Sequence, residues 1–175
     1  MTRYAAFLRG VNLGKRTVKS ADLKAAFEGM GFAGVKTLLA SGNVLFDAKA
    51  SKGLKDTIEA GLAKQFGFSI GVVLRSLEEL TAMVASNPFG GVVESDAAKL
   101  HVTLFDKPIP KGFVQPPVKG DFDVPSVSER ELFLIVYRKP DGTYLGGSTL
   151  DTEKRLPKGT LVTSRNWNTI LKAIA

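Results

Sequence analysis

Hydrophobic positions in the first half of the chain alternate between strand-like runs and helix-like spacing. Short apolar runs predict four strands, at Tyr4–Leu8, Val35–Leu39, Val44–Phe46 and Ile70–Leu74. Two stretches between these runs carry apolar residues three or four positions apart, which predicts one amphipathic helix in each. Ser20 and Ser51 open the two stretches, and Gly31 and Gly67 close them.

The predicted order of these elements is β-α-β-β-α-β. Only the short segment Ala40–Asn43 separates the second and third strands, which favours a hairpin. This order is that of the ferredoxin-like split β-α-β unit. We therefore expect a ferredoxin-like subdomain over residues 1–75.

The second half mixes helix and strand signals less regularly. Ser76 and Glu79 have capping-box spacing, which predicts a third helix that ends before Asn87-Pro88. Five of the eight prolines lie in Lys107–Pro125, so we expect an extended connection there. The remaining elements are predicted to be two strands and a terminal helix, at Lys99–Phe105, Leu132–Tyr137 and Ser164–Ile174.

These patterns predict an α+β protein. The ferredoxin-like subdomain is expected to pack against a smaller, less regular α+β subdomain over residues 99–175, with a helix and a connection over 76–98 between them. Both faces of the first strand are apolar, since Tyr4, Ala6 and Leu8 alternate with Ala5 and Phe7. The helices of a ferredoxin-like unit cover one face only, so the second half of the chain or a second copy is expected to cover the other.

Composition excludes several kinds of site. The chain has no cysteine, which excludes disulfides, zinc–thiolate sites, iron–sulfur clusters and cysteine nucleophiles. Its single histidine, His101, leaves no multi-histidine metal site within one chain. Asp121 with Asp123, and Glu129 with Glu131, are spaced to share a strand face, but solvated charges explain these pairs better than a metal site. We expect no metal and no cofactor.

Hydropathy argues against a membrane protein. The longest stretch without a charged residue, Thr81–Val93, has 13 residues and is broken by proline and glycine. No apolar segment of signal-peptide length precedes Arg9. We expect a cytoplasmic protein, and the apolar second face of the first strand leaves open a monomer or a weak dimer.

The positive charge is unevenly distributed. The formal net charge is +7, and the 12 Lys and Arg against 7 Asp and Glu through residue 90 supply most of it. Within this half, the predicted strand-to-helix loop over residues 9–19 contains the candidate anion-binding residues Arg9, Asn12, Lys15, Arg16 and Lys19. A helix N-terminus favours a bound anion, so we expect a phosphate or nucleic-acid backbone contact here; the alternative is a solvated basic loop.

Two further segments carry candidate polar groups. Ser41 and Asn43 flank Gly42 between strands two and three, where they either form the turn or donate to the anion site near Arg9. His101 alternates with Lys99 on a predicted strand, opposite an apolar face. Its imidazole is expected to be accessible or set in a polar interface, either as a structural group or as a proton-transfer group.

The predicted terminal helix separates a core residue from polar candidates. Trp167 begins an i, i+3, i+4, i+7 apolar spacing and is expected to anchor the core. Arg165 would lie in the first turn after a Ser164 cap, which is unfavourable for a cation unless an acidic side chain or an external anion pairs with it. Asn166 and Asn168 complete the candidate binding residues.

Four motifs identify a family resemblance: Arg9-Gly10-Val11-Asn12-Leu13-Gly14, Ser41-Gly42-Asn43-Val44, Lys99-Leu100-His101-Val102 and Thr163-Ser164-Arg165-Asn166-Trp167-Asn168. In these segments, and over almost its whole length, the chain resembles the bacterial domain of unknown function 1697 family. The resemblance implies an α+β fold with a ferredoxin-like N-terminal part and implies no activity.

The sequence supports three hypotheses of function. The first is a site for a small phosphorylated or carboxylated ligand, bound by the basic loop, with or without catalysis through His101. The second is nucleic-acid backbone binding, although Asn43-Val44-Leu45-Phe46 lacks the aromatic pattern of an RNA-recognition strand. The third is an interaction module whose polar motifs brace the fold.

Overall fold

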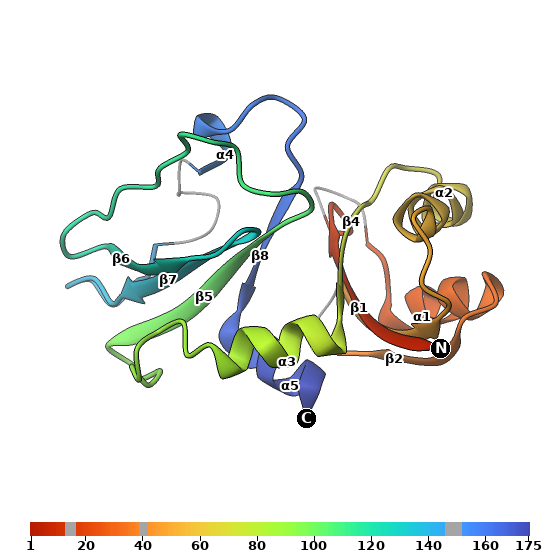
Figure 1. Ribbon diagram of the computed structural model, residues 1–175, viewed down its shortest axis with the longest axis horizontal. Coiled ribbons are helices and arrows are strands. Elements are labelled where there is room, and N and C mark those ends of the chain that lie inside the picture. Colours follow the sequence, from red (N-terminus) through yellow and green to blue (C-terminus); the bar gives the residue numbers. More distant parts are fainter. Residues whose placement is uncertain (13–16, 39–41, 146–151) are drawn as a thin grey trace. The chain divides into compact units, whose positions relative to one another are not determined.

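The structure is a computed structural model of the 175-residue chain. It describes residues 1–12, 17–38, 42–145 and 152–175 (Figure 1). Two units divide the chain: unit 1 comprises Met1–Ala82 and Leu171–Ala175, and unit 2 comprises Met83–Ile170. Over the described residues, the fold is mixed α+β with two antiparallel four-stranded sheets.

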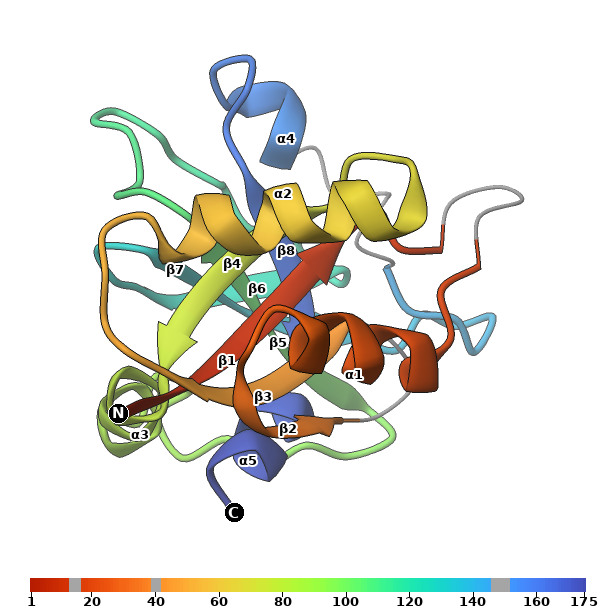
Figure 2. The ribbon, with the colours of Figure 1, turned by 90° about the vertical axis from the view of Figure 1, so that its right-hand side faces the viewer.

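Unit 1 contains the predicted order of strands and helices. Its elements are β1 (Thr2–Arg9), α1 (Ser20–Gly29), β2 (Ala33–Thr37), β3 (Asn43–Ala48), α2 (Leu54–Phe66) and β4 (Gly71–Ser76). The strand order is β2-β3-β1-β4, and every neighbouring pair is antiparallel. Helices α1 and α2 lie next to each other on one face of this sheet (Figure 2).

Alternation along β1 explains how the sheet and helices of unit 1 pack. Ala6 and Leu8 belong to the hydrophobic core that the helices share with the sheet. Ala5 and Phe7, on the other face, are only 2% and 1% exposed. Both faces of β1 are therefore buried, as its pattern predicts.

The element boundaries in unit 1 differ from prediction by one to three residues; for example, β1 begins at Thr2 instead of Tyr4 and β4 ends at Ser76 instead of Leu74. Lys19, not Ser20, is the N-cap position of α1, and no side chain of the described residues caps this helix. Helix α2 begins at Leu54, because Ser51 forms a preceding turn in which its carbonyl accepts the Leu54 N–H at 3.3 Å. Strand β2 begins two residues before the predicted Val35, because the backbone of Ala33 pairs with Asp47 across a bulge; Leu39 lies outside the described residues.

The predicted capping box is confirmed at α3 (Leu77–Ala85). The Glu79 N–H donates to Ser76 Oγ at 3.1 Å, and the Ser76 N–H donates to a carboxylate oxygen of Glu79 at 2.8 Å. These reciprocal bonds satisfy two amides that the helix leaves without acceptors. None of the helices in the described ranges is long and apolar enough to cross a membrane.

Unit 2 holds the second antiparallel sheet. Its elements are β5 (Ala98–Phe105), β6 (Phe122–Val127), β7 (Glu131–Tyr137), α4 (Thr152–Arg155) and β8 (Val162–Asn166), and α5 (Trp167–Ile174) begins in it. The strand order is β6-β7-β5-β8. This half is more regular than predicted, because β6 and β8 complete a four-stranded sheet.

Strand β6 was not predicted because it contains Pro125. Proline cannot donate to a strand ladder, so it is tolerated on edge strands and at bulges. Strand β6 is an edge strand, and its register shifts between Asp123 and Ser126, on either side of Pro125. The predicted connection over Lys107–Pro125 is therefore wrong in its last residues.

The start of the terminal helix was predicted three residues early. Ser164 does not cap a helix, because it lies in β8 opposite Thr103. Asn166 caps α5 instead: its Oδ1 accepts the Asn168 N–H at 2.8 Å. The prediction that Trp167 anchors the core is confirmed, since its ring packs edge-on against Phe89 and Phe133.

Candidate functional site

The predicted anion loop lies in unit 1 between β1 and α1. Arg9 ends β1 and is exposed, and exposed Lys19 immediately precedes α1. Asn12 organises the described part of the loop, since its Oδ1 accepts the Val18 N–H at 3.2 Å. Lys15 and Arg16 lie outside the described residues.

The N-terminus of α1 faces this loop. Its first helical hydrogen bond runs from the Leu23 N–H to the Lys19 carbonyl at 3.0 Å, so the preceding amides have no acceptor within the helix. No described side chain caps them, although Asp22 places a carboxylate in the first turn. The loop thus combines helix amides with cations at both of its ends.

Asn43 braces the chain rather than opening toward a ligand. It is 6% exposed, and its Nδ2 donates to the Leu38 carbonyl at 3.2 Å. The Leu38 N–H returns a bond to the Asn43 carbonyl at 2.9 Å. Asn43 lies opposite Phe7, so the expected proximity of the start of β3 to the end of β1 is confirmed. Ser41 lies outside the described residues.

A polar cluster in unit 2 gathers three of the predicted residues around Glu94, which the sequence analysis missed. One carboxylate oxygen of Glu94 accepts the Leu100 N–H and Asn166 Nδ2, both at 3.1 Å. The other accepts Asn168 Nδ2 at 3.2 Å. Glu94 therefore ties the segment before β5 to the junction of β8 and α5.

His101 lies directly opposite Asn166 in the pairing of β5 with β8. Directly opposed side chains on one sheet face have Cβ atoms about 4.5–5.5 Å apart, so the imidazole is next to the amide that binds Glu94. The ring is partly buried, and no described residue forms a hydrogen bond with it. Burial lowers the pKa of His101, and the negative charge of Glu94 partly opposes this effect. The ring is therefore neutral near pH 7.

The neighbouring positions on this face are polar as well. Thr103 Oγ1 and Ser164 Oγ, one pair further along the two strands, are 2.9 Å apart and share a hydrogen bond. In the other direction, Lys99 Nζ lies 5.8 Å from the centroid of the Tyr144 ring. His101 is thus set in a polar strip, as its alternation with Lys99 predicts.

Arg165 does not occupy the first turn of a helix. It lies in β8, where Nη1 donates to Thr163 Oγ1 at 2.6 Å and to the Ser164 carbonyl at 2.8 Å. Burial lowers the pKa of Arg165 to about 10, so the guanidinium stays charged at neutral pH. The helix-dipole argument for an anion at Arg165 is therefore wrong, because the strand continues through it.

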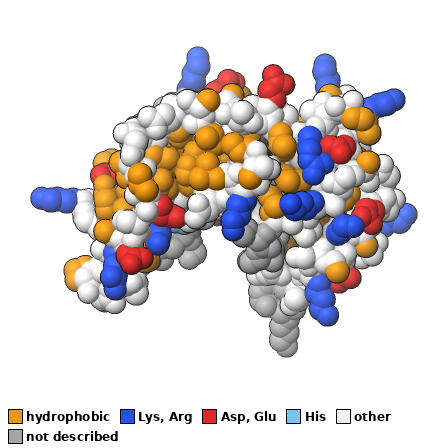
Figure 3. All heavy atoms as spheres, turned by 90° about the horizontal axis from the view of Figure 1, so that it is seen from below, with side chains coloured by type: hydrophobic (Ala, Val, Ile, Leu, Met, Phe, Trp, Pro, Cys, Tyr) orange, Lys and Arg blue, Asp and Glu red, His pale blue; other side chains and the backbone are white. Residues whose placement is uncertain are grey.

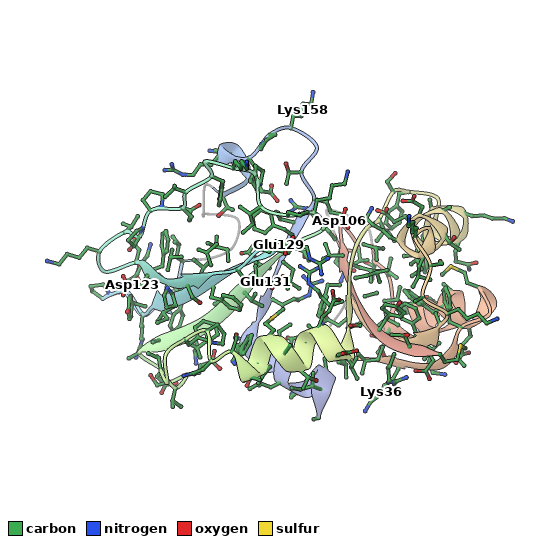
Figure 4. All side chains as sticks on the ribbon, in the orientation of Figure 1. Lys36, Asp106, Asp123, Glu129, Glu131 and Lys158 are labelled. Carbon is green, nitrogen blue, oxygen red and sulfur yellow. The ribbon has the colours of Figure 1, made fainter. Side chains whose placement is uncertain are left out.

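One carboxylate of each acidic pair accepts a hydrogen bond from a neighbouring side chain. Tyr137 Oη donates to Asp123 at 2.6 Å, and Ser128 Oγ donates to Glu131 at 2.8 Å. Figure 4 shows Glu129 and Glu131 close together and Asp123 well apart from them. Within the described ranges, no three His, Asp or Glu residues are grouped to hold a metal ion.

Unit 2 also has a shallow, open depression. Its lining residues are Asp96, Ala97, Arg138, Lys139 and Pro140. None of the candidate site residues is among them. The predicted residues are therefore gathered in two places: Arg9, Asn12 and Lys19 at the loop of unit 1, and His101, Asn166 and Asn168 around Glu94 in unit 2.

The environment of His101 gives a direct test by titration. We expect the midpoint of its ring resonances in NMR to lie below the ordinary value of 6.5, and to fall further in Glu94→Gln because the carboxylate favours the imidazolium. The pKa of His101 is lower in the folded chain than in the unfolded chain, so the unfolded chain binds the proton more tightly. The contribution of His101 therefore lowers the free energy of unfolding as the pH falls below about 6.5. Glu129→Gln serves as the control and should leave the midpoint unchanged. A midpoint above 6.5 in the unmodified protein would contradict this environment.

Comparison with known proteins identifies the family without assigning an activity. A search of curated proteins finds no match. Among solved structures, the chain is similar to the conserved bacterial protein SP0830 from Streptococcus pneumoniae, with 22% identity and a TM-score of 0.66 over 98% of this chain and 96% of that one. This likeness concerns the fold. The model of the family described as "Protein of unknown function (DUF1697)" matches residues 1–131, and the chain belongs to this family.

Proposed function

We propose that unit 1 is a ferredoxin-like domain that binds a small phosphorylated or carboxylated compound at the connection between β1 and α1. The element order β-α-β-β-α-β and the antiparallel order β2-β3-β1-β4 support the domain assignment. The binding proposal depends mainly on one arrangement: exposed Arg9 and Lys19 stand at the two ends of a loop that leads into helix amides without a side-chain cap. Such amides bind anions, and the cations add charge-assisted donors.

The charge of the surrounding chain favours an anion. Residues 9–19 contain Arg9, Lys15, Arg16 and Lys19 and no acidic residue. A bound anion would be attracted by these cations and by the positive end of the helix dipole. Asn12 and Asn43 hold the backbone around the loop, so their role in the proposal is positional.

A small ligand is favoured over a nucleic acid by the distribution of the remaining charge. On the face seen in Figure 3, Lys and Arg side chains are interspersed with Asp and Glu. Backbone recognition of a nucleic acid uses several phosphate contacts at once. The loop offers one local concentration of cations instead.

The experiment measures the thermal shift produced by inorganic phosphate at low and moderate salt. We expect phosphate to stabilise the protein, and Arg9→Ala and Lys19→Ala each to weaken its binding by about tenfold, since each removes a charge-assisted contact. Lys36→Ala is the matched control, because Lys36 is exposed on the edge strand β2 and its side chain points outward in Figure 4. It should leave the shift unchanged.

Two outcomes would overturn the proposal. Equal phosphate shifts in all three variants would mean that the loop is not the site. Binding of single-stranded nucleic acid with a steep salt dependence, without binding of phosphate, would favour the polymer instead.

A further inference from the structure

The Glu94 cluster of unit 2 presents acceptors rather than cations. Glu94 carries a negative charge, is partly buried, and forms no ion pair with any Lys or Arg of the described residues. Its three hydrogen-bond partners are the Leu100 N–H and the amides of Asn166 and Asn168, which are all neutral. The carboxylate is therefore fixed in position, but its charge is not neutralised by the protein.

His101 and Asn168 add two further acceptors beside this carboxylate. A neutral imidazole has one acceptor nitrogen, and no described group donates to the His101 ring. The Asn168 amide donates its nitrogen to Glu94 at 3.2 Å, and no described residue donates to its oxygen. Asn166 connects the groups, since it binds Glu94 at 3.1 Å and lies opposite His101.

We propose that Glu94, His101 and Asn168 form a binding site for the protonated amino group of a small molecule, separate from the anion site proposed in unit 1. A primary ammonium carries one positive charge and three N–H donors. The cluster supplies one negative charge and three kinds of acceptor: a carboxylate, an imidazole nitrogen and an amide oxygen. The ammonium therefore matches the cluster in two respects: its positive charge pairs with the carboxylate, and its three N–H donors correspond to the three kinds of acceptor.

No charged group of the described residues around His101 takes the place of the proposed ammonium ligand. Lys99 is on the same face of β5, but its ammonium lies over the Tyr144 ring. Arg165 flanks Asn166 in β8, and its guanidinium donates to Thr163 and to the Ser164 carbonyl. On the segment before β5, Asp96 accepts the Tyr144 hydroxyl through its backbone carbonyl. Neither Lys99 nor Arg165 forms an ion pair with Glu94 in the described structure.

A metal ion fits the cluster less well. His101 and Glu94 are its only ligands of the His, Asp or Glu type, and no group of three such residues occurs in the described ranges. Divalent transition metals in proteins are usually held by three or four such ligands. An ammonium requires acceptors only, which is what the cluster offers.

The experiment titrates the full-length protein with methylammonium chloride and follows the ring resonances of His101 by NMR. His101 is the single histidine of the chain, so these resonances are assigned without further variants. We expect a saturable shift, and a lower His101 pKa in the complex because the bound cation opposes imidazolium formation. Tetramethylammonium carries the same charge without N–H donors and should produce no saturable shift.

Glu94→Gln is the principal variant. It keeps an oxygen that can accept the Leu100 N–H and removes the charge, so we expect methylammonium to bind at least about tenfold more weakly. Glu129→Gln removes an exposed carboxylate elsewhere in unit 2 and should leave binding unchanged. If Glu94→Gln does not fold, Asn168→Ala provides the test, because it leaves two of the three donors to Glu94 and should still weaken binding.

The proposal is overturned if methylammonium gives no saturable shift in the unmodified protein. Equal shifts with tetramethylammonium, or unchanged binding in the folded Glu94 variant, would also overturn it. The phosphate experiment uses variants of Arg9 and Lys19, and neither side chain is among the hydrogen-bond partners of Glu94. Failure of the phosphate experiment therefore leaves the ammonium site standing, and the reverse also holds.

Discussion

Phe46→Ala is expected to lower the free energy of unfolding by about 3–5 kcal/mol, a large part of the total stability of an ordinary domain. Phe46 is 0% exposed and lies in the core that the sheet of unit 1 shares with its helices. Its ring centroid is 5.7 Å from that of Tyr4, 5.3 Å from that of Phe27 and 4.9 Å from that of Phe32. Removing the ring leaves these three rings facing a cavity.

Urea denaturation followed by far-UV circular dichroism would measure this loss as a lower midpoint at an unchanged slope. Phe68→Ala is the control: it makes the same substitution in unit 1, but Phe68 is only partly buried. It should cost clearly less than Phe46→Ala. Equal losses would contradict the central position of Phe46 in this core.

Features determined by nearby residues were predictable from the sequence. The capping box at Ser76 and Glu79 requires residues three positions apart, and both of its bonds form. Short apolar runs located the strands of unit 1. The short connection Ala40–Asn43 restricts which strands can pair, because it favours a hairpin between the two strands that it joins. The strand boundaries were predicted only to within about two residues, at the bulge in β2 and also in the regular strands β1 and β4.

Features determined by distant residues were not predictable in the same way. Ser164 has the side chain of a helix cap, but its hydroxyl pairs with Thr103, which is 61 positions away in the chain. That pairing extends β8 through Arg165 and removes the argument for an anion at a helix N-terminus. Serine and threonine suit caps and strands alike, so the local pattern does not decide between them.

The candidate site shows the same limit. His101, Asn166 and Asn168 could be chosen for their chemistry, but the residue that gathers them could not. Glu94 binds Asn166 and Asn168, which are 72 and 74 positions away in the sequence. The pairing of β5 with β8 brings these segments together. A single acidic residue between a loop and a strand has no sequence signature that separates it from a solvated surface charge.

Phe133→Ala is expected to cost about 3–5 kcal/mol in unit 2. Phe133 lies in β7, is 2% exposed and makes edge contacts with two other rings. Its centroid is 5.7 Å from that of Phe89 and 6.0 Å from that of Trp167, at interplanar angles of 85° and 81°. Such contacts contribute about 0.5–1.5 kcal/mol beyond the buried area, so the loss should lie above that of an aliphatic residue of similar burial.

Trp167 makes this second prediction measurable at the site of the change. It is the single tryptophan of the chain, so its fluorescence reports on the ring cluster. Phe133→Ala should shift its emission to longer wavelength in the folded protein, because water reaches the indole where the Phe133 ring was.

Phe133→Leu keeps most of the volume and should recover most of the stability without restoring the edge contact. Val127→Ala, at a neighbouring strand position that is 56% exposed, should change stability by no more than about 0.5 kcal/mol. A Phe133→Ala variant with unchanged emission and midpoint would show that the indole is held by other contacts than this ring.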